Sequence, residues 1–371
     1  MALSVGIVGL PNVGKSTLFN ALTSSKVEAA NYPFATINPN KGIVRVLDPR
    51  VNVLSDHFQP EKTIYATIEF NDIAGLVRGA NRGEGLGNQF LGHIRECDVI
   101  LQVVRCFGDT DIIHVENSVD AERDIGIINL ELIFKDLDTL YKRKGKVETK
   151  ARVNKEKEAM FELDILNKLI PALENETPAR LVKDLNNIER AFVKANYGLL
   201  TFKPVIYVAN ISDTEYQSFE SNDQFNKVKA IASSEHAEVV AISAAIEAEI
   251  SSMTSGEQEL YFAELGIDKS GLNKISEVAY KTLGLLSFFT VGKDEVRAWT
   301  FLEGMTAPQC AGVIHSDFER GFIRADVYHY EDFLKYRDEV KVKEAGKMRS
   351  EGKEYLMKDG DIVFFKFNVK K

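Results

Sequence analysis

A phosphate-binding loop stands near the start of the chain. Residues 9–17, GLPNVGKST, fit the pattern G-x-x-x-x-G-K-[ST], between a strand-like apolar run and the helix-like TLFNALTS. Glycines let the backbone amides of such a loop surround phosphate oxygens, and the following helix adds the positive end of its dipole. Lys15 is expected to reach the β and γ phosphates during catalysis, and Ser16 to bind Mg²⁺. The sequence therefore predicts a nucleoside triphosphate site that works with magnesium.

Two further segments lie where a GTPase carries its switch loops. YPFATINPNKG, residues 32–42, includes Thr36, which can complete the magnesium shell when a γ phosphate is present. The plainer interpretation of Thr36 is a turn residue, the usual role of a loop threonine. DIAG, residues 72–75, ends a strand with Asp72, a carboxylate suited to hold Mg²⁺ through water. We expect Ser16, Thr36 and Asp72 to form the magnesium site.

The residue that orients the attacking water is not where many GTPases place it. Those enzymes have a glutamine after the DxxG motif, whereas this chain has Leu76, which cannot form a hydrogen bond with water. Intrinsic hydrolysis should therefore be slow, or another group must activate the water. Our hypothesis is His114, in DTDIIHV, because histidine exchanges a proton near neutral pH. A structural loop histidine is the alternative.

The base site carries a modified guanine motif. GTPases read guanine with Asn-Lys-x-Asp at a strand end, and this chain has Asn210, Ile211 and, two residues later, Asp213. Asp213 by itself favours guanine, whose N–H donors a carboxylate accepts, whereas Ile211 replaces the lysine whose stem covers the guanine ring. After the strand EVVAI, Ser243 and Ala244 are expected to present backbone groups to the base.

Asn12 occupies a position from which its side-chain oxygen could hold a monovalent cation against the phosphates. A potassium ion there would supply the charge that an arginine finger provides in other enzymes. The alternative is that Asn12 only shapes the turn, since asparagine is a common turn residue.

Short runs rich in Val and Ile must position these loops. They recur along the chain as VGIV (5–8), TIEF (67–70), VILQVV (99–104), PVIYVA (204–209) and EVVAI (238–242). Each has the length of a buried strand, and helix-like segments separate most of them, which is the pattern of a parallel sheet covered on both faces. The sequence predicts a doubly wound α/β domain.

The alternation of strands and helices is interrupted between about residues 130 and 200. Apolar residues recur there at helical spacing in three groups: Leu130, Ile133, Leu137 and Leu140; Leu163, Leu166, Leu169 and Leu173; Leu181, Leu185 and Ile188. This pattern predicts an antiparallel helical insertion. Its tip, residues 142–158, holds eight basic and three acidic residues. The tip is either a phosphate-binding arm or simply a solvated face.

A separate module follows from about residue 287. FFTV, VRAWTF, FIRADVY and DIVFFKF alternate as strands do, with Asp359-Gly360 as a hairpin turn signal and one helix near residues 331–337. We expect a small mixed α/β module.

Composition limits the class of protein. A chain of 371 residues with 44% hydrophobic residues suits two or three globular domains, and its net charge of -9 confines any nucleic-acid contact to a local patch. Three widely spaced cysteines fit buried thiols in a reducing compartment. No stretch has the apolar length of a membrane span and no leader peptide is visible, so we expect a cytoplasmic protein.

Taken together, the motifs GLPNVGKST, YPFATI, DIAGLVRGA, GEGLGNQFL and VRCF, with EVRAWT and HSDFERGFIRA further on, closely resemble the Obg-like ATPase family called YchF. The likeness covers nearly the whole chain. It implies an α/β fold in which a P-loop NTPase (GTPase-like) domain carries a coiled-coil insertion and a C-terminal TGS domain of β-grasp fold. The expected boundaries are 1–129 and 201–280 for the nucleotide domain, 130–200 for the insertion and 284–367 for the TGS domain.

By position, the resemblance assigns phosphate binding to Asn12, Val13, Gly14, Lys15, Ser16 and Thr17. It assigns magnesium to Ser16 and Thr36, and the base pocket to Asn210 and Ile211. The chain departs from the family at Asp213, where the family typically has glutamate, and this departure bears on the choice of base.

The resemblance implies a ribosome-associated ATPase that prefers ATP over GTP, with a regulatory role in translation or stress response. Alternatives are a GTP-preferring GTPase and a nucleotide-gated ribosome-binding module in which hydrolysis is incidental. We expect the large ribosomal subunit to meet the basic tip and the C-terminal module, where Arg320 and Arg324 flank a strand. Ribosomal RNA is a candidate contact, and no membrane contact is expected.

Overall fold

The computed structural model describes residues 3–24, 40–73, 86–108, 115–116, 118–152, 155–267 and 269–368. The chain divides into two compact units. Unit 1 is Met1–Lys26, Ile37–Gly42 and Glu69–Ile275, and unit 2 is Val27–Thr36, Ile43–Ile68 and Ser276–Lys371.

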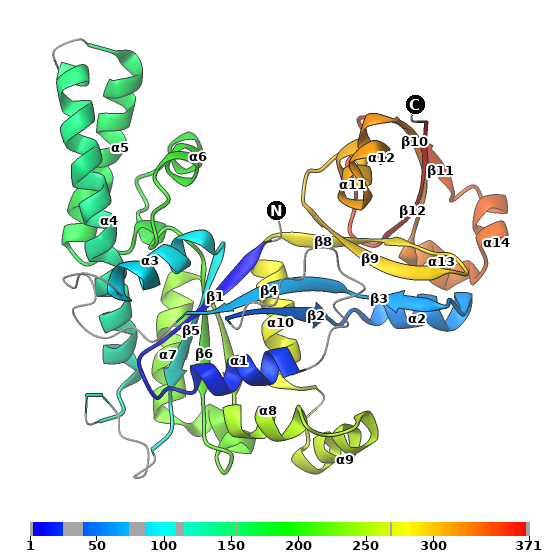
Figure 1. Cartoon of the computed structure of the whole chain (residues 1–371), viewed down its shortest axis with the longest axis horizontal. Helices are drawn as coiled ribbons and strands as arrows, with labels where there is room; N and C mark the ends of the chain where they lie inside the picture. Colours follow the sequence, from blue (N-terminus) through cyan, green and yellow to red (C-terminus); the bar gives the residue numbers. More distant parts are fainter. Residues whose placement is uncertain are drawn as a thin grey trace. The chain divides into compact units, whose positions relative to one another are not determined.

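The first sheet has six strands in the order β2-β4-β1-β5-β6-β7 (Figure 1). Their bounds are β1 Ser4–Val8, β2 Lys41–Val46, β4 Ala66–Asp72, β5 Val99–Arg105, β6 Val205–Asn210 and β7 Glu238–Ile242. The pairs β1–β4, β1–β5, β5–β6 and β6–β7 are all parallel, and every residue of β1, β5 and β6 is buried. Central strands covered on both faces read as continuous apolar runs, so the sequence could locate them.

Helices follow the strands in the order that the predicted α/β fold requires. They are α1 Lys15–Ser24, α3 Leu86–Glu96, α7 Asp223–Glu235, α8 Ala244–Ile250, α9 Ser255–Leu265 and α10 Gly271–Thr282. α1 packs on β1 and on α8, whereas α7 packs on β6 and β7. The predicted P-loop domain of the GTPase type is therefore confirmed.

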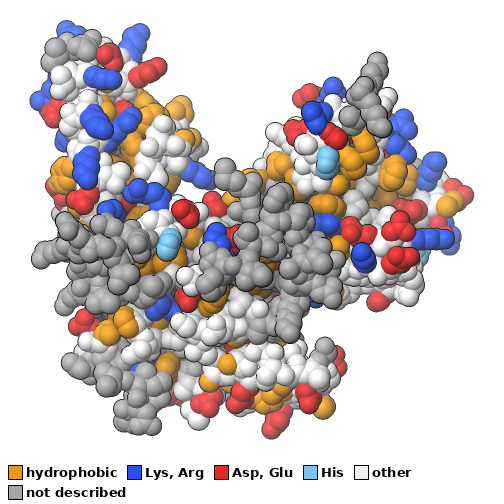
Figure 2. Space-filling model, in the orientation of Figure 1, with side chains coloured by type: hydrophobic (Ala, Val, Ile, Leu, Met, Phe, Trp, Pro, Cys, Tyr) orange, Lys and Arg blue, Asp and Glu red, His pale blue; other side chains and the backbone are white. Residues whose placement is uncertain are grey.

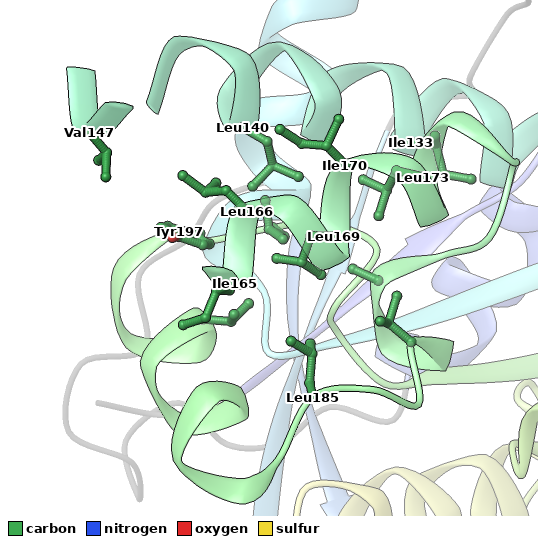
Figure 3. Close-up of a cluster of buried hydrophobic side chains, with 14 of the residues drawn as sticks. Ile133, Leu140, Val147, Ile165, Leu166, Leu169, Ile170, Leu173, Leu185 and Tyr197 are labelled. Atoms are coloured by element: carbon green, nitrogen blue, oxygen red, sulfur yellow. The ribbon is translucent and has the colours of Figure 1, made fainter. Parts of the chain in front are cut away.

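The predicted helical insertion is present as a long arm (Figure 1). It contains α4 Ala121–Arg152, α5 Lys157–Glu174, the short 3-10 helix η2 Ala179–Leu181 and α6 Asn187–Asn196. α4 packs along α5, and Figure 3 shows Leu140, Leu166 and Leu169 in the apolar cluster between them. The helical spacing of these leucines identified the two long helices because each apolar stripe lies on the buried side.

The third predicted helical group does not form a helix over residues 181–188. Instead, Asn186 accepts hydrogen bonds from the backbone N–H groups of Ile188 and Glu189, and α6 begins there with a capping box. Ile188 is 73% exposed, so it belongs to no apolar stripe. A strong N-cap outweighs apolar spacing because it satisfies backbone donors that no other group reaches.

Unit 2 contains the second sheet, in the order β11-β10-β12-β8-β9-β3. Its C-terminal strands are β8 Leu285–Thr290, β9 Glu295–Leu302, β10 Phe322–His329, β11 Arg349–Glu351 and β12 Asp361–Phe367. β12 runs parallel to β8, while the pairs β8–β9, β10–β12 and β10–β11 are antiparallel. With α11 Ala307–Ile314 over the buried side, this is the expected β-grasp arrangement.

A segment from the first part of the chain belongs to unit 2. Residues 43–68 include α2 Pro49–Phe58 and β3 Lys62–Ile64, and β3 pairs in parallel with β9. The boundaries expected from the sequence assigned this segment to the nucleotide domain. The strand that β3 pairs with, β9, lies more than two hundred residues away in the chain, so no local sequence pattern indicates the pairing.

Cys97, Cys106 and Cys310 are buried free thiols, as predicted, and burial raises the pKa of Cys106 and Cys310 to about 12. Among the described residues no helix is long and apolar enough to cross a membrane.

Candidate functional site

The phosphate-binding loop connects β1 to α1 and has a backbone that few residue types adopt. Asn12 has φ 61° and Gly14 has φ 97°, both in the left-handed region. Asparagine tolerates this region and glycine has no penalty there. A Cβ atom on Gly14 would also overlap the side-chain nitrogen of Asn210. The turn itself therefore requires the glycine and favours the asparagine, whatever Asn12 also binds.

Lys15 is the first residue of α1 and its side chain turns back into the loop. The ammonium donates a hydrogen bond to the carbonyl of Leu10, at 2.6 Å, and the residue is buried. Burial lowers the pKa of Lys15 to about 8, and the nearby carboxylate of Asp72 offsets part of this fall. A phosphate group would be a stronger partner than one carbonyl, because it brings the negative charge that a buried ammonium lacks.

Asp72 ends β4 beside Lys15 and Ser16. Burial raises the pKa of its carboxyl group, and Lys15 and the Ser16 hydroxyl oppose the rise. Its Oδ1 atom is buried without a hydrogen-bond partner among the described residues. A carboxylate oxygen of this kind, with a serine hydroxyl close by, suits Mg²⁺, which prefers oxygen ligands. The residues present therefore fit the magnesium ion that P-loop NTPases typically use.

Asn210 joins the phosphate-binding loop to the expected base site. Its Nδ2 donates to the carbonyl of Val13 at 2.9 Å, and its Oδ1 accepts from the backbone N–H of Ala244 at 3.0 Å. Both ends of the buried amide are thus used within the protein. The structure brings Val13, Gly14, Asn210 and Ala244 together, although Val13 and Asn210 are 197 residues apart. Asn210 acts first as a tie between two loops.

The other predicted base-site residues differ in exposure. Ile211 is buried, and its backbone N–H donates to the carbonyl of Ile242 at 2.8 Å. Ser243 is buried and its hydroxyl caps α8 by accepting from the N–H of Ile246. Asp213 is exposed, and its carboxylate accepts from the N–H of Thr214 at 2.8 Å.

The remaining predicted site residues divide into two groups. Ser16 and Thr17 lie exposed in the first turn of α1, where the helix N-terminus favours anions. Thr36, Leu76 and His114 lie outside the described residues.

The sequence reasoning missed Glu247, which supports the base-site loops. This buried residue of α8 accepts a hydrogen bond from the N–H of Gly271, at 2.5 Å, at the start of α10. Burial raises the pKa of Glu247 to about 7. Its only sequence signal is a glutamate among apolar residues in AAIEAEI, which also fits an ordinary helix surface.

Comparisons with known proteins agree with this geometry. A family model described as a 50S ribosome-binding GTPase matches residues 4–135, and the YchF C-terminal family, described as a protein of unknown function (DUF933), matches residues 285–368. The ribosome-binding ATPase YchF of Bacillus subtilis is 52% identical over 369 residues, which is 100% of both chains. The protein of the same name from Escherichia coli O157:H7 is 49% identical over 369 residues, again 100% of both.

A solved structure is also similar along the whole chain. The YchF GTPase of Schizosaccharomyces pombe superposes with a TM-score of 0.88 at 40% sequence identity, covering 98% of each chain. The bacterial relatives are named ATPases and this structure is named a GTPase, so the names of the relatives differ on the base.

Proposed function

This chain belongs to the YchF family of ribosome-binding ATPases, and from that membership we propose that it binds ATP with Mg²⁺, hydrolyses it slowly and acts in association with the ribosome. The observation that carries the proposal is the meeting of Lys15, Ser16 and Asp72 at the phosphate-binding loop, tied by Asn210 to the loop after β7. The proposed association with the ribosome rests on the relatives, which are named ribosome-binding ATPases.

Each residue of the loop has a distinct part in this proposal. The amides of residues 12–17 receive the phosphate oxygens at the N-terminus of α1. Lys15 exchanges the carbonyl of Leu10 for the β and γ phosphates. Ser16, Asp72 and Thr36 would hold Mg²⁺, which, when bound, neutralises charge on the phosphates.

The preference for ATP rests on the exposure of Asp213 and on Ile211, which replaces the lysine whose stem covers the guanine ring. Asp213 is exposed and already accepts a hydrogen bond from the Thr214 backbone. Adenine has no N–H donor for a carboxylate at the ring position where guanine has one. A carboxylate turned toward solvent therefore does not lower the affinity for adenine. Asp213 can still turn toward guanine, which keeps the GTP-preferring alternative and predicts a modest margin between the two nucleotides.

Slow hydrolysis follows from Leu76, and two residues are proposed to compensate. His114 would activate the water, and Asn12 would help hold a potassium ion near the phosphates. His114→Ala should then lower turnover at unchanged ATP affinity, and potassium should support faster hydrolysis than sodium. Equal rates in the two salts would leave Asn12 with its turn-forming role, which its left-handed backbone already requires.

The ribosome surface is proposed to include the arm and the C-terminal module, with the large subunit and its RNA as the partner. Figure 2 shows many Lys and Arg side chains on the arm. Lys142, Lys144 and Lys146 belong to α4 within the basic tip. In the C-terminal module Arg320 and Arg324 are exposed, and each has an acidic neighbour. A cytoplasmic location follows from such a partner.

The experiment that tests this function compares turnover and binding in one preparation. ATP and GTP are titrated into nucleotide-free protein, and ATP hydrolysis is measured with and without isolated large ribosomal subunits. The proposal expects tighter ATP binding and magnesium-dependent turnover that large subunits stimulate. Ribosome binding without any stimulation would favour the alternative of a nucleotide-gated binding module. Tighter GTP binding would replace the ATPase with a GTPase.

A further inference from the structure

The strand register of unit 2 places four residues on one face of the β10–β12 pair. Residues that lie directly opposite each other in two strands share a face, and successive residues of a strand alternate between faces. The residues that alternate with these four are Ala325 and Val327 in β10 and Val363 and Phe365 in β12, and they are buried in the core of the unit. The four, which we call the outer face, are Arg324 opposite Lys366 and Asp326 opposite Phe364.

The outer face combines an exposed aromatic ring with two cations. Phe364 is 60% exposed, and the ammonium of Lys366 lies 3.9 Å from the centroid of its ring. Arg324 stands across from Lys366 and its side chain is 55% exposed. Asp326 lies 3.5 Å from Arg324 and is the one acid among the four. The outer face therefore has a net positive charge in a protein whose net charge is -9.

An irregularity in β10 adds a second exposed apolar residue. The register between β10 and β12 shifts between Phe322 and Arg324, which leaves Ile323 as the extra residue of a bulge. Ile323 is 56% exposed. Ile323 and the Phe364 ring therefore leave apolar surface in water beside two cations, and a ligand with both an apolar face and negative charge would cover it.

We propose that the outer face is a stacking platform for an unpaired nucleotide of single-stranded RNA. Lys366 would move from the Phe364 ring to a flanking phosphate, which frees the ring face for the base, and Arg324 would lie beside the other phosphate. Aromatic rings stack on any base, and lysine or arginine beside the ring binds the backbone, which is how sheets commonly hold single strands. This inference rests on the proposed ribosome association, because the ribosome supplies the RNA.

The chemistry of the outer face favours RNA over a protein partner. Three of its four residues are charged, whereas the centres of protein interfaces are depleted of charge and enriched in apolar side chains. One ring with a cation over it, together with the exposed Ile323, offers too little apolar area for a stable protein contact. The same ring with two cations matches one base and its two phosphates.

The test measures binding of the full-length protein to a short fluorescein-labelled oligouridylate by fluorescence anisotropy, with a perfectly paired RNA hairpin as competitor. Phe364→Ala should weaken binding about tenfold, since stacking on one aromatic ring typically contributes that order of affinity. Phe364→Tyr keeps the ring and should keep most of the affinity. Lys366→Glu should weaken binding and flatten its dependence on salt. Leu356→Ala, which changes an apolar residue that is 55% exposed outside the outer face, should have no effect.

Three results would overturn the platform. The first is equal affinity of the Phe364→Ala variant and the unchanged protein for the oligouridylate, and the second is equal competition by the paired hairpin. The third is a Phe364→Ala variant that loses a protein partner and keeps its affinity for RNA. Pelleting with ribosomes is measured in the same preparations. If the protein pellets with ribosomes but does not bind the oligouridylate, only the stacking platform is overturned. If the protein does not pellet with ribosomes, the proposed ribosome association is overturned.

Discussion

Arg50 and Asp359 are 309 residues apart in the chain and form an ion pair with two hydrogen bonds. Arg50 Nη1 lies 2.7 Å from one carboxylate oxygen and Nη2 lies 3.2 Å from the other. The same carboxylate accepts from the backbone N–H of Ser287, and the guanidinium also contacts Asp48. One arginine of α2 thus fixes the start of that helix to the turn before β12, all within unit 2. The predicted hairpin at Asp359-Gly360 is not present in the described part of unit 2, because β11 and β12 each pair with β10 and not with each other.

Arg50→Ala should destabilise unit 2. Removing the guanidinium leaves the largely buried Asp48 and the exposed Asp359 without their cation, which costs about 1–2 kcal/mol of unfolding free energy. Trp299 lies in β9 and is the one tryptophan of the chain, so its fluorescence during urea unfolding reports on unit 2. Arg152→Ala removes an exposed pair within α4 and should change stability by less than about 0.5 kcal/mol. Equal effects of the two substitutions would contradict the role of Arg50.

Nucleotide binding should take up protons at mildly alkaline pH. The pKa of Lys15 is lowered to about 8, so about half of the unliganded protein carries a neutral Lys15 at pH 8, and phosphate favours the charged form. Affinity should therefore fall as the pH rises above about 8. Calorimetry at pH 8 in two buffers of different ionisation enthalpy should detect about half a proton per ATP. Lys15→Arg stays charged and should abolish the uptake. Uptake that persists in that variant would assign the proton to another group.

Asn210→Ala should weaken ATP and GTP to a similar degree. The amide ties Val13 to Ala244, so its loss loosens both the phosphate loop and the base loop, at about 1–3 kcal/mol for the two lost partners. Asp213→Ala is the matched comparison, because this exposed carboxylate touches neither loop through its side chain. We expect Asp213→Ala to weaken the binding of GTP and to leave the binding of ATP unchanged. Titration with both nucleotides separates the two effects, and an altered ATP to GTP ratio in Asn210→Ala would mean direct base contact.

Asp72→Asn should remove most of the benefit that magnesium gives to ATP binding. The substitution keeps the shape of the side chain and removes the charge, so affinity should fall about tenfold in magnesium and little in a chelator. Because burial raises the pKa of Asp72, the carboxylate gains its proton at a higher pH than an ordinary aspartate. The magnesium effect should therefore decline as the pH falls, and the decline should begin at a higher pH than an ordinary aspartate would give. Glu69→Gln, on the same strand, should leave the effect of magnesium on ATP affinity unchanged.

Charge reversal at Lys142, Lys144 and Lys146 should weaken co-sedimentation with ribosomes and reduce its salt dependence. Arg143 is left out because it forms an ion pair with the largely buried Glu162 and therefore supports the arm itself. The control reverses Lys183 and Lys194, which are exposed in the insertion outside the basic tip. Equal loss from both sets would indicate a general effect of net charge rather than a contact at the tip.

The sequence by itself determined the elements whose causes are local. The phosphate-binding loop is contiguous, and its glycines and lysine act within nine residues. The buried strands β1, β5 and β6 are visible because a parallel sheet covered on both faces requires continuous apolar runs. The long helices α4 and α5 are visible because their apolar stripe repeats with the period of a helix.

Only the tertiary structure decided which distant groups meet. The sequence assigns Asn210 to the base pocket, and the fold adds that its amide bonds to Val13 and Ala244. Arg143 belongs to the basic tip, and the fold pairs it with Glu162. Strand β3 pairs with β9 although no turn joins them. The chemical type of a side chain determines which bonds it can form. Which partner it meets depends on how folding brings distant parts of the chain together. This long-range closure is set by the packing of the whole unit and leaves no mark in the local pattern.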